Sequence, residues 1–346
     1  MASLSTPLLV AVFAAGAAAT WIAGVFLSKA TDALDARYGL GDALGGVILL
    51  AIAGTLPEIA ITVSAARAGH LDLAVGNLIG GVAVQTLVLV VLDLASGPER
   101  PLSFLVGSLL PVIEALIVMV VLGTALGGAV LSPSTNFLGG SPTSYAVVVI
   151  WLVGVWVVNR ARTRGQWRVE TPAGATPGRH HRRQGDDHPY PHASNLVVIA
   201  IFLAASVVTL VAGVALQDSG SLLAGRLHMG GAVFGATVLA FATALPEISS
   251  GIAAVKLGDM QLAVSDILGG NSFQITLLLL ADLIAGTPVI VAAHHSDVWL
   301  GAAGMLMTGI AAIAVIARPQ RTFLWLGIDS IALVAVYAAA IALLPK

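Results

Sequence analysis

The chain has 346 residues, of which 58% are hydrophobic and 10% are charged, and its mean hydropathy is +0.96. These values exclude a water-soluble globular domain and indicate a polytopic membrane protein. The formal net charge of -2 gives no reason to expect a nucleic-acid partner, and the absence of cysteine excludes disulfides, thiolate metal sites and cysteine nucleophiles.

Hydrophobic stretches of spanning length follow one another along the whole chain. The first has no basic residue ahead of it, so we expect a transmembrane helix there rather than a cleaved signal peptide. The predicted spans, of which the fifth is the shortest, cover residues 7–27, 40–66, 72–93, 102–123, 143–158, 195–216, 230–255, 260–284, 297–317 and 322–344. The sequence therefore predicts an all-α membrane protein of about ten transmembrane helices.

A polar and basic segment, residues 159–194, separates the fifth span from the sixth. Its proline, glycine and charge content predicts a flexible linker between two five-helix halves, residues 1–158 and 195–346. The linker also contains four histidines, which could gather a metal but are more typical of a solvated tract: His180, His181, His188 and His192.

The basic residues are distributed unevenly between the two sides of the predicted bundle. If the linker is cytoplasmic, 13 of the 16 lysines and arginines lie on the cytoplasmic side, and only Arg67, Arg226 and Lys346 lie outside. Such a positive-inside bias predicts that both termini face outward and that the linker is cytoplasmic. We expect an integral protein of a bacterial plasma membrane, with the lipid bilayer as its surroundings and a monomer as a plausible state.

Residues 53–94 repeat as residues 242–283. Without a gap, the two segments agree at 16 of 42 positions. Because each half has an odd number of predicted helices, the second copy enters the membrane from the opposite side, and such inverted repeats place a substrate site near the midplane. The matches that chance would not readily supply are Pro57 with Pro246, Glu58 with Glu247, and Gln85 with Gln274.

Each copy places a Pro-Glu pair in the middle of a hydrophobic helix. Proline has no amide hydrogen, so it frees the carbonyl four residues earlier, at Ala53 and Ala242. A carboxylate at the bilayer centre costs about 2.5–3.5 kcal/mol on insertion scales, so two in symmetric positions indicate function. The alternative is that Glu58 and Glu247 are protonated and only structural.

The groups near the two breaks are rich in oxygen. Two carboxylates, two freed carbonyls and the hydroxyls of Thr55 and Thr243 suit a hard cation such as Ca²⁺, which takes about 6–8 oxygens. Gln85 and Gln274 follow their glutamates at one and the same spacing, on the next predicted helix of each copy. They would add an oxygen ligand or orient the glutamate, although a lone membrane glutamine more often holds helices together.

These motifs resemble the calcium:cation antiporter superfamily, which contains the sodium/calcium and proton/calcium exchangers. The corresponding elements read AGTLPE with GNLIGGVAVQ, and ATALPE with SDILGGNSFQ. The resemblance implies ten helices with two broken ones crossing at the centre, and alternating access to one buried cation site. It also implies a transporter rather than an enzyme, without a cofactor, that exchanges Ca²⁺ or a related divalent cation for Na⁺ or H⁺.

The chain departs from the family pattern in ways that leave the counter-ion open. Glycines 81 and 270 replace a serine of the family motif, and glutamines replace the asparagine or aspartate of sodium/calcium exchangers. Two carboxylates balance one Ca²⁺ or two protons. The roles of two further acids stay open: Glu114 is a protonation site or a packed neutral acid, and Asp266 is a relocated acid or an ordinary helix residue. A passive cation channel or an ion-sensing membrane protein on the same fold is the alternative function.

Overall fold

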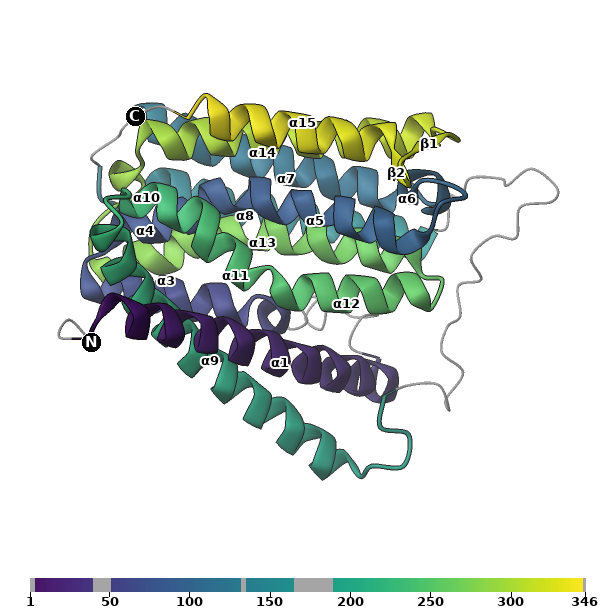
Figure 1. The fold of residues 1–346 in the computed structure, drawn as a ribbon, viewed down its shortest axis with the longest axis horizontal. Coiled ribbons are helices and arrows are strands. Elements are labelled where there is room, and N and C mark those ends of the chain that lie inside the picture. Colours follow the sequence, from purple (N-terminus) through teal and green to yellow (C-terminus); the bar gives the residue numbers. More distant parts are fainter. Residues whose placement is uncertain (1–3, 40–50, 132–134, 165–188, 345–346) are drawn as a thin grey trace.

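The computed structural model describes residues 4–39, 51–131, 135–164 and 189–344. Within these residues, seven helices are long and apolar enough to cross a membrane, or eight if a pair bent by 41° is counted as one span. Most helices run along the long axis of the molecule, and both ends of the chain lie at the same end of the bundle (Figure 1). The predicted helical membrane protein is confirmed, whereas most of the predicted linker lies outside the described residues.

The first half consists of helices joined by short turns, with a π-helical turn inside one of them. Its elements are α1 (Thr6–Tyr38), α3 (Leu56–Ala68), α4 (Leu71–Val75), η2 (Gly76–Gly80), α5 (Gly81–Ser96), α6 (Leu102–Leu105), α7 (Leu110–Leu131) and α8 (Pro142–Arg164). The chain is also helical at residues 51–54, just before α3.

The second half follows a similar plan and adds a short hairpin. Its elements are α9 (Asn195–Arg226), α10 (Gly231–Phe234), η3 (Gly235–Leu239), α11 (Ala240–Thr243), α12 (Leu245–Lys256), α13 (Met260–Ala285), η4 (Val289–Ala292), α14 (His295–Ala317), β1 (Thr322–Phe323), β2 (Leu326–Gly327) and α15 (Ile328–Ala342). The two strands pair antiparallel with each other.

Five predicted spans were wrong in their bounds. The first and the sixth continue well beyond residues 27 and 216, as α1 to Tyr38 and as α9 to Arg226. The fourth does not begin at residue 102, because Gly107 turns with a φ of 62° and the long helix α7 starts only at Leu110. The fifth is 23 residues long rather than short, since its polar end simply continues the helix as α8. The tenth begins only at Ile328, because the residues before it form the hairpin of β1 and β2, whose turn residues Leu324 and Trp325 have positive φ angles.

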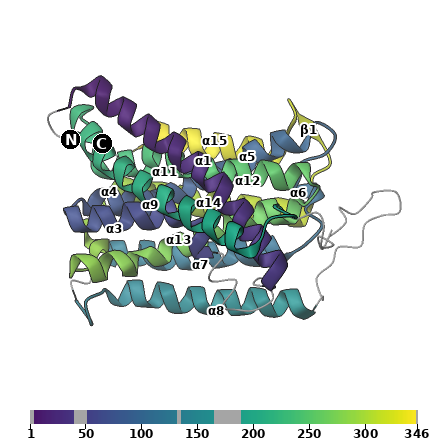
Figure 2. The ribbon, with the colours of Figure 1, turned by 90° about the horizontal axis from the view of Figure 1, so that it is seen from below.

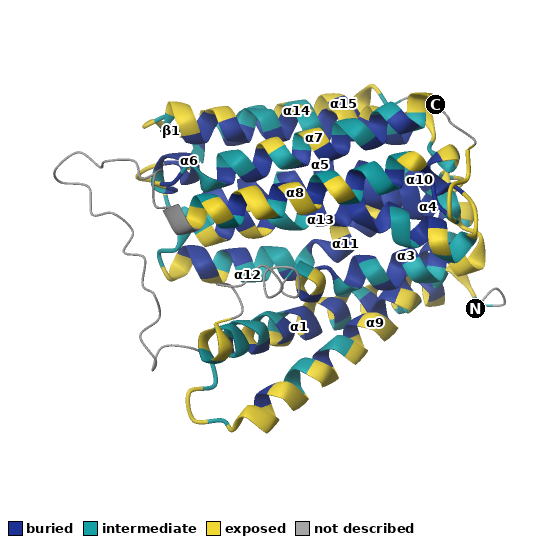
Figure 3. Cartoon of the chain, turned by 180° about the vertical axis from the view of Figure 1, so that it is seen from behind, coloured by how far each residue is buried: buried dark blue, intermediate teal, exposed yellow. Residues whose placement is uncertain are grey.

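Helices α5 and α13 are the most enclosed of the long helices, whereas α1, α8 and α9 leave much of their surface exposed (Figure 3). An apolar exterior around a packed centre is the pattern expected of a membrane protein, in which lipid replaces water at the outer face. The centre of the bundle is therefore where a buried charged group must be held by protein groups.

Helices α1 and α9 pack side by side and lie together across the other helices (Figures 1 and 2). Each is tied to the start of the other: Arg37 near the end of α1 donates to Asn195 Oδ1 at 2.6 Å, and Arg226 at the end of α9 donates to Thr6 Oγ1 at 3.1 Å. The pair is therefore joined at both ends by side-chain hydrogen bonds.

Two aspartates near the ends of α5 and α13 are buried. Asp93 is 1% exposed and Asp282 is not exposed. Asp93 accepts hydrogen bonds from the backbone of Leu102 and Gly327, and Asp282 accepts from the backbone of Ser141 and Val289. Each carboxylate thus accepts from the amides of two connecting segments and fixes the loops at its own end of the bundle: Asp93 at the end where α6 and β2 lie, and Asp282 at the opposite end, where η4 packs against α4.

Candidate functional site

Both predicted breaks are present and place the glutamates in the first turn of a new helix. The chain turns at Thr55 before α3, and α11 and α12 meet at an angle of 41°. Proline stands in the first turn of α3 and of α12, where its missing amide hydrogen costs little. Glu58 and Glu247 follow directly, at the end of the helix that favours negative charge.

The freed carbonyls belong to buried residues. Ala53 and Ala242 are each 3% exposed, and their usual helical donors would be the nitrogens of Pro57 and Pro246, which carry no hydrogen. Thr55 uses its hydroxyl locally, donating to the Ala51 carbonyl at 2.9 Å.

Glu58 lies in the most enclosed part of the site, with no exposed surface. The side-chain amide of Gln85 donates to its Oε1 at 3.2 Å, whereas its Oε2 has no hydrogen-bond partner. The hydroxyl of Thr243, from the second break, lies beside the same carboxyl group. The structure therefore brings one residue of the second repeat to the glutamate of the first.

Glu247 is more accessible than Glu58. It is partly buried and its Oε2 lacks a hydrogen-bond partner. Its charge interacts electrostatically with that of Glu58, so the two glutamates, which belong to different halves of the chain, are neighbours in space. Like charges in a low-dielectric interior repel strongly, and a bound cation or proton removes that repulsion.

The two glutamines are not used alike. Gln274 donates to the carbonyl oxygens of Asn77 and Leu78, both at 2.9 Å, rather than to Glu247. These carbonyls belong to the π-helical turn η2, and a carbonyl oxygen can accept a second hydrogen bond with its other lone pair. The Oε1 atom of Gln274 is buried without a partner. Gln85 thus orients a glutamate, whereas Gln274 holds a backbone turn.

A cavity of about 920 Å³ connects the breaks to the end of the bundle where α8 finishes. Of the predicted site residues, Ala53, Thr55 and Glu247 line it, whereas Glu58, Gln85, Gln274, Thr243 and Ala242 do not. Helices α1, α7, α8, α12 and α13 form its walls. One glutamate of the pair therefore faces this cavity and the other lies behind it.

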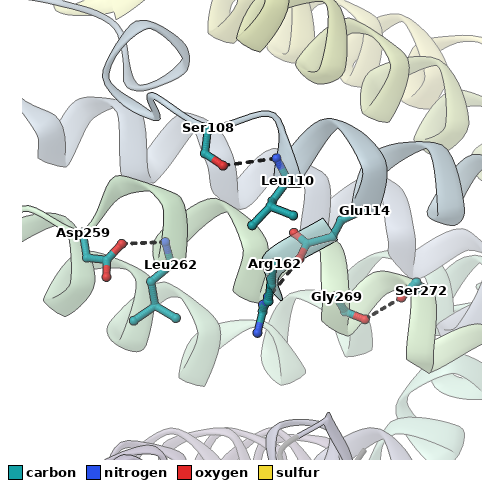
Figure 4. Close-up of polar contacts among 8 residues, drawn as sticks. All are labelled: Ser108, Leu110, Glu114, Arg162, Asp259, Leu262, Gly269 and Ser272. Atoms are coloured by element: carbon teal, nitrogen blue, oxygen red, sulfur yellow. Dashed lines mark hydrogen bonds and ion pairs between the residues drawn. The ribbon is translucent and has the colours of Figure 1, made fainter. Parts of the chain in front are cut away.

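Two acids whose roles the sequence left open line the same cavity. Figure 4 shows the Glu114 carboxylate facing Arg162, and the atoms Oε1 and Nη2 are 3.7 Å apart. Asp266 accepts a hydrogen bond from the Ser250 hydroxyl at 2.9 Å. These contacts could not be predicted from sequence spacing, because the two partners of each pair come from different helices.

The groups around the two helix breaks include carboxylate, hydroxyl, amide and carbonyl oxygens, but few carboxylates lie close to one another. Among the described residues, no three or more histidines, cysteines, aspartates or glutamates lie close enough together to hold a metal ion. A cation at the breaks would therefore take two carboxylates and complete its shell with neutral oxygens or water. Oxygen ligands of this kind favour hard cations.

The sequence and the fold of the chain are both similar to those of known proteins. The family model described as sodium/calcium exchanger protein matches residues 8–160 and 197–344, which is most of the chain. The inner membrane protein YrbG of Escherichia coli (strain K12) is 26% identical over 258 residues, covering 72% of this chain and 71% of its own length.

Solved structures of exchangers have the same fold. The H⁺/Ca²⁺ exchanger CAX superposes with a TM-score of 0.69 at 13% identity, over 98% of this chain and 82% of its own. The sodium-calcium exchanger NCX_Mj superposes with a TM-score of 0.59 at 17% identity, over 99% of this chain and all of its own.

Proposed function

Because the chain belongs to the sodium/calcium exchanger protein family, within the calcium:cation antiporter superfamily, we propose that it exchanges Ca²⁺ or a related divalent cation for Na⁺ or H⁺. The observation that supports the proposal is the pair Glu58 and Glu247, whose charges interact and which each have one carboxylate oxygen without a hydrogen-bond partner among the described residues. Carboxylates held in this way need a cation or a proton.

The proposed ion site combines groups from both breaks. Glu58 and Glu247 supply the charge, and Thr55 and Thr243 supply hydroxyls. The freed carbonyls of Ala53 and Ala242 add neutral oxygens, as in other transporters with interrupted helices. In this proposal Gln85 orients Glu58, and Gln274 supports the site indirectly by fixing the turn η2.

Two inverted five-helix repeats are part of the proposal, and contacts in the first and sixth predicted spans support them. The sequence offset that relates Glu58 to Glu247 also relates Gly24 to Gly213. Gly24 packs against Pro246 of the second break and Gly213 packs against Pro57 of the first. Each break is therefore covered by the equivalent glycine of the other half.

Two arginines at the ends of α1 and α9 obey the same relation. Arg37 and Arg226 are separated by the same offset as the glutamates. Arg37 donates to the Ala193 carbonyl and Arg226 donates to the Leu4 carbonyl, and this offset also relates the two acceptors. Equivalent contacts at opposite ends of a helix pair are what an axis in the membrane plane produces.

The position of the cavity supports alternating access as part of the proposal. In the proposed orientation, with the linker cytoplasmic and both termini outside, the cavity opens Glu247 to the cytoplasmic side. Movement of α1 and α9 as one unit past the two breaks would close this route and open another to Glu58. The close packing of Gly24 and Gly213 against the prolines permits such sliding, because neither glycine has a side chain that would interlock.

The test is uptake of radiolabelled Ca²⁺ into proteoliposomes under a Na⁺ gradient and, separately, under a pH gradient. Exchange predicts uptake that saturates with Ca²⁺ and depends on one of the two gradients. Uptake that ignores both gradients would indicate a passive channel, and no uptake under either would exclude Ca²⁺ as the substrate.

A further inference from the structure

Two carboxylates outside the central pair share its cavity. Glu114 on α7 is 7% exposed, and Asp266 on α13 is exposed within the cavity. Glu247 lines the same cavity, and the charge of Asp266 interacts electrostatically with those of both Glu114 and Glu247. The three acids therefore form a row that leads from the centre of the bundle toward its linker end.

Polar atoms in this row lack partners. Ser265, which is 8% exposed and lines the cavity, has its hydroxyl beside the Glu114 carboxylate. Within the part of the chain that the structure describes, neither Ser265 Oγ nor Glu114 Oε2 makes a hydrogen bond with normal geometry. Buried polar atoms without partners are rare because they forfeit their hydration, and their convergence on one cavity indicates a ligand.

The positive charge beside Glu114 belongs to Arg162 and is held only weakly. Arg162 stands at the outer end of the row, with its Nη2 3.7 Å from Glu114 Oε1 and its side chain 40% exposed. At that distance the pair is an electrostatic contact rather than a short hydrogen bond, and solvent screens it. An incoming cation can therefore replace the guanidinium at Glu114 at little cost.

The repeat does not duplicate this acid pair. At the sequence offset that relates Glu58 to Glu247, the position equivalent to Asp266 is Asn77 and the position equivalent to Glu114 is Ala303. The pair therefore belongs to one side of the membrane only, unlike the central glutamates. If the acid pair acts at the entrance on one side of the membrane, only one repeat needs it. If it took part in the exchange step itself, we would expect an equivalent pair in both repeats.

We infer that Glu114 and Asp266, with Ser265, form a second cation site that binds a hydrated divalent cation on the linker side, before the ion reaches Glu247. Two carboxylates and a hydroxyl are too few to replace a full hydration shell, so the ion keeps several waters there. This inference rests on the proposed antiport function, in which the second site binds the cation before it moves to Glu247. Cation binding at the second site can be measured without any exchange.

The direct test uses Tb³⁺, a luminescent substitute for Ca²⁺, because Trp151 lines the same cavity and can sensitise its emission. Purified protein carrying Glu58→Gln and Glu247→Gln, which removes the central charges, should still give saturable sensitised emission that Ca²⁺ competes away. Adding Glu114→Gln and Asp266→Asn should abolish that emission, whereas Glu99→Gln, at an exposed turn, should leave it unchanged. Emission that survives the added pair, or is absent before it, would overturn the site.

Arg162→Gln separates cation binding from a structural role. Removing the competing positive charge should tighten Tb³⁺ binding, whereas loss of a merely structural contact would leave the affinity unchanged or weaken it, and either result would contradict the proposal. In proteoliposomes, Glu114→Gln with Asp266→Asn should raise the KM for Ca²⁺ at the linker face and leave the KM at the opposite face unchanged. If the protein does not exchange Ca²⁺ at all, the Tb³⁺ measurement still decides whether the second site exists.

Discussion

The packing of two glycines against the two prolines leads to a quantitative prediction about the sliding helices. A methyl group added at Gly213 would lie 2.6 Å from Ala60 Cβ and 3.2 Å from the Pro57 carbonyl oxygen. One added at Gly24 would lie 2.5 Å from Pro246 Cβ. Ordinary carbon contacts are about 3.5–4.0 Å, so each alanine overlaps its neighbour by about 1 Å. The obstacles are the Ala60 methyl group with the Pro57 carbonyl oxygen in one case and the Pro246 ring in the other, and none of them can rotate away.

Overpacking of this kind costs about 1–3 kcal/mol, so Gly24→Ala or Gly213→Ala should disfavour the described conformation by about 5- to 150-fold relative to others. Because the chain has no cysteine, a single cysteine placed at Ser28 in the cavity wall can report that conformation. Labelling by a membrane-impermeant maleimide from the linker side should fall in both variants, and the exchange rate should fall with it.

Gly225→Ala is the matched control, since it lies on the same helix as Gly213 and an added methyl group would meet no atom within 4 Å. Size-exclusion profiles would show whether the variants remain folded. If folded Gly24→Ala and Gly213→Ala label and exchange as Gly225→Ala does, the two prolines do not form the sliding surface.

Two further predictions concern the glutamines and the helix pair. Gln85→Leu removes a hydrogen bond to a charged group, worth about 1.5–3 kcal/mol, so it should weaken Ca²⁺ binding, measured by titration calorimetry, at least as much as Gln274→Leu does. Weaker binding in Gln274→Leu alone would contradict the assignment of Gln85 as the residue that orients Glu58. Arg37→Ala combined with Arg226→Ala should slow exchange more than the product of the two single effects, because the hydrogen bonds of either arginine alone still hold α1 to α9. If the double variant slows exchange only by the product of the single effects, the two arginines act independently.

The helical membrane class, the breaks and the glutamate pair could be predicted from the sequence because each depends on local chemistry. Proline removes a donor wherever it stands in a helix, and a carboxylate in a long apolar stretch is costly in any fold. The repeat then places Glu58 and Glu247 together once the odd number of spans is counted. In the structure the charges of the two glutamates interact electrostatically, and their joint role as an ion site remains a prediction.

Contacts between helices that are distant in sequence could not be predicted in the same way. Gln274 matches Gln85 in the repeat, yet it donates to the Asn77 and Leu78 carbonyls, because the packing of α13 against η2 brings these carbonyls within its reach. The meeting of Glu114 with Arg162 and Asp266 depends on how α7, α8 and α13 pack. Hydropathy reports which segments enter the membrane, whereas it carries no information about which faces meet.

The central claim is that Glu58 and Glu247 together bind the transported cation. Its most direct test is exchange of radiolabelled Ca²⁺ in proteoliposomes that contain Glu58→Gln, Glu247→Gln or, as a control, Glu99→Gln. The account predicts that either central substitution abolishes exchange and that Glu99→Gln retains it. Ca²⁺ exchange that persists in both central variants would contradict the account.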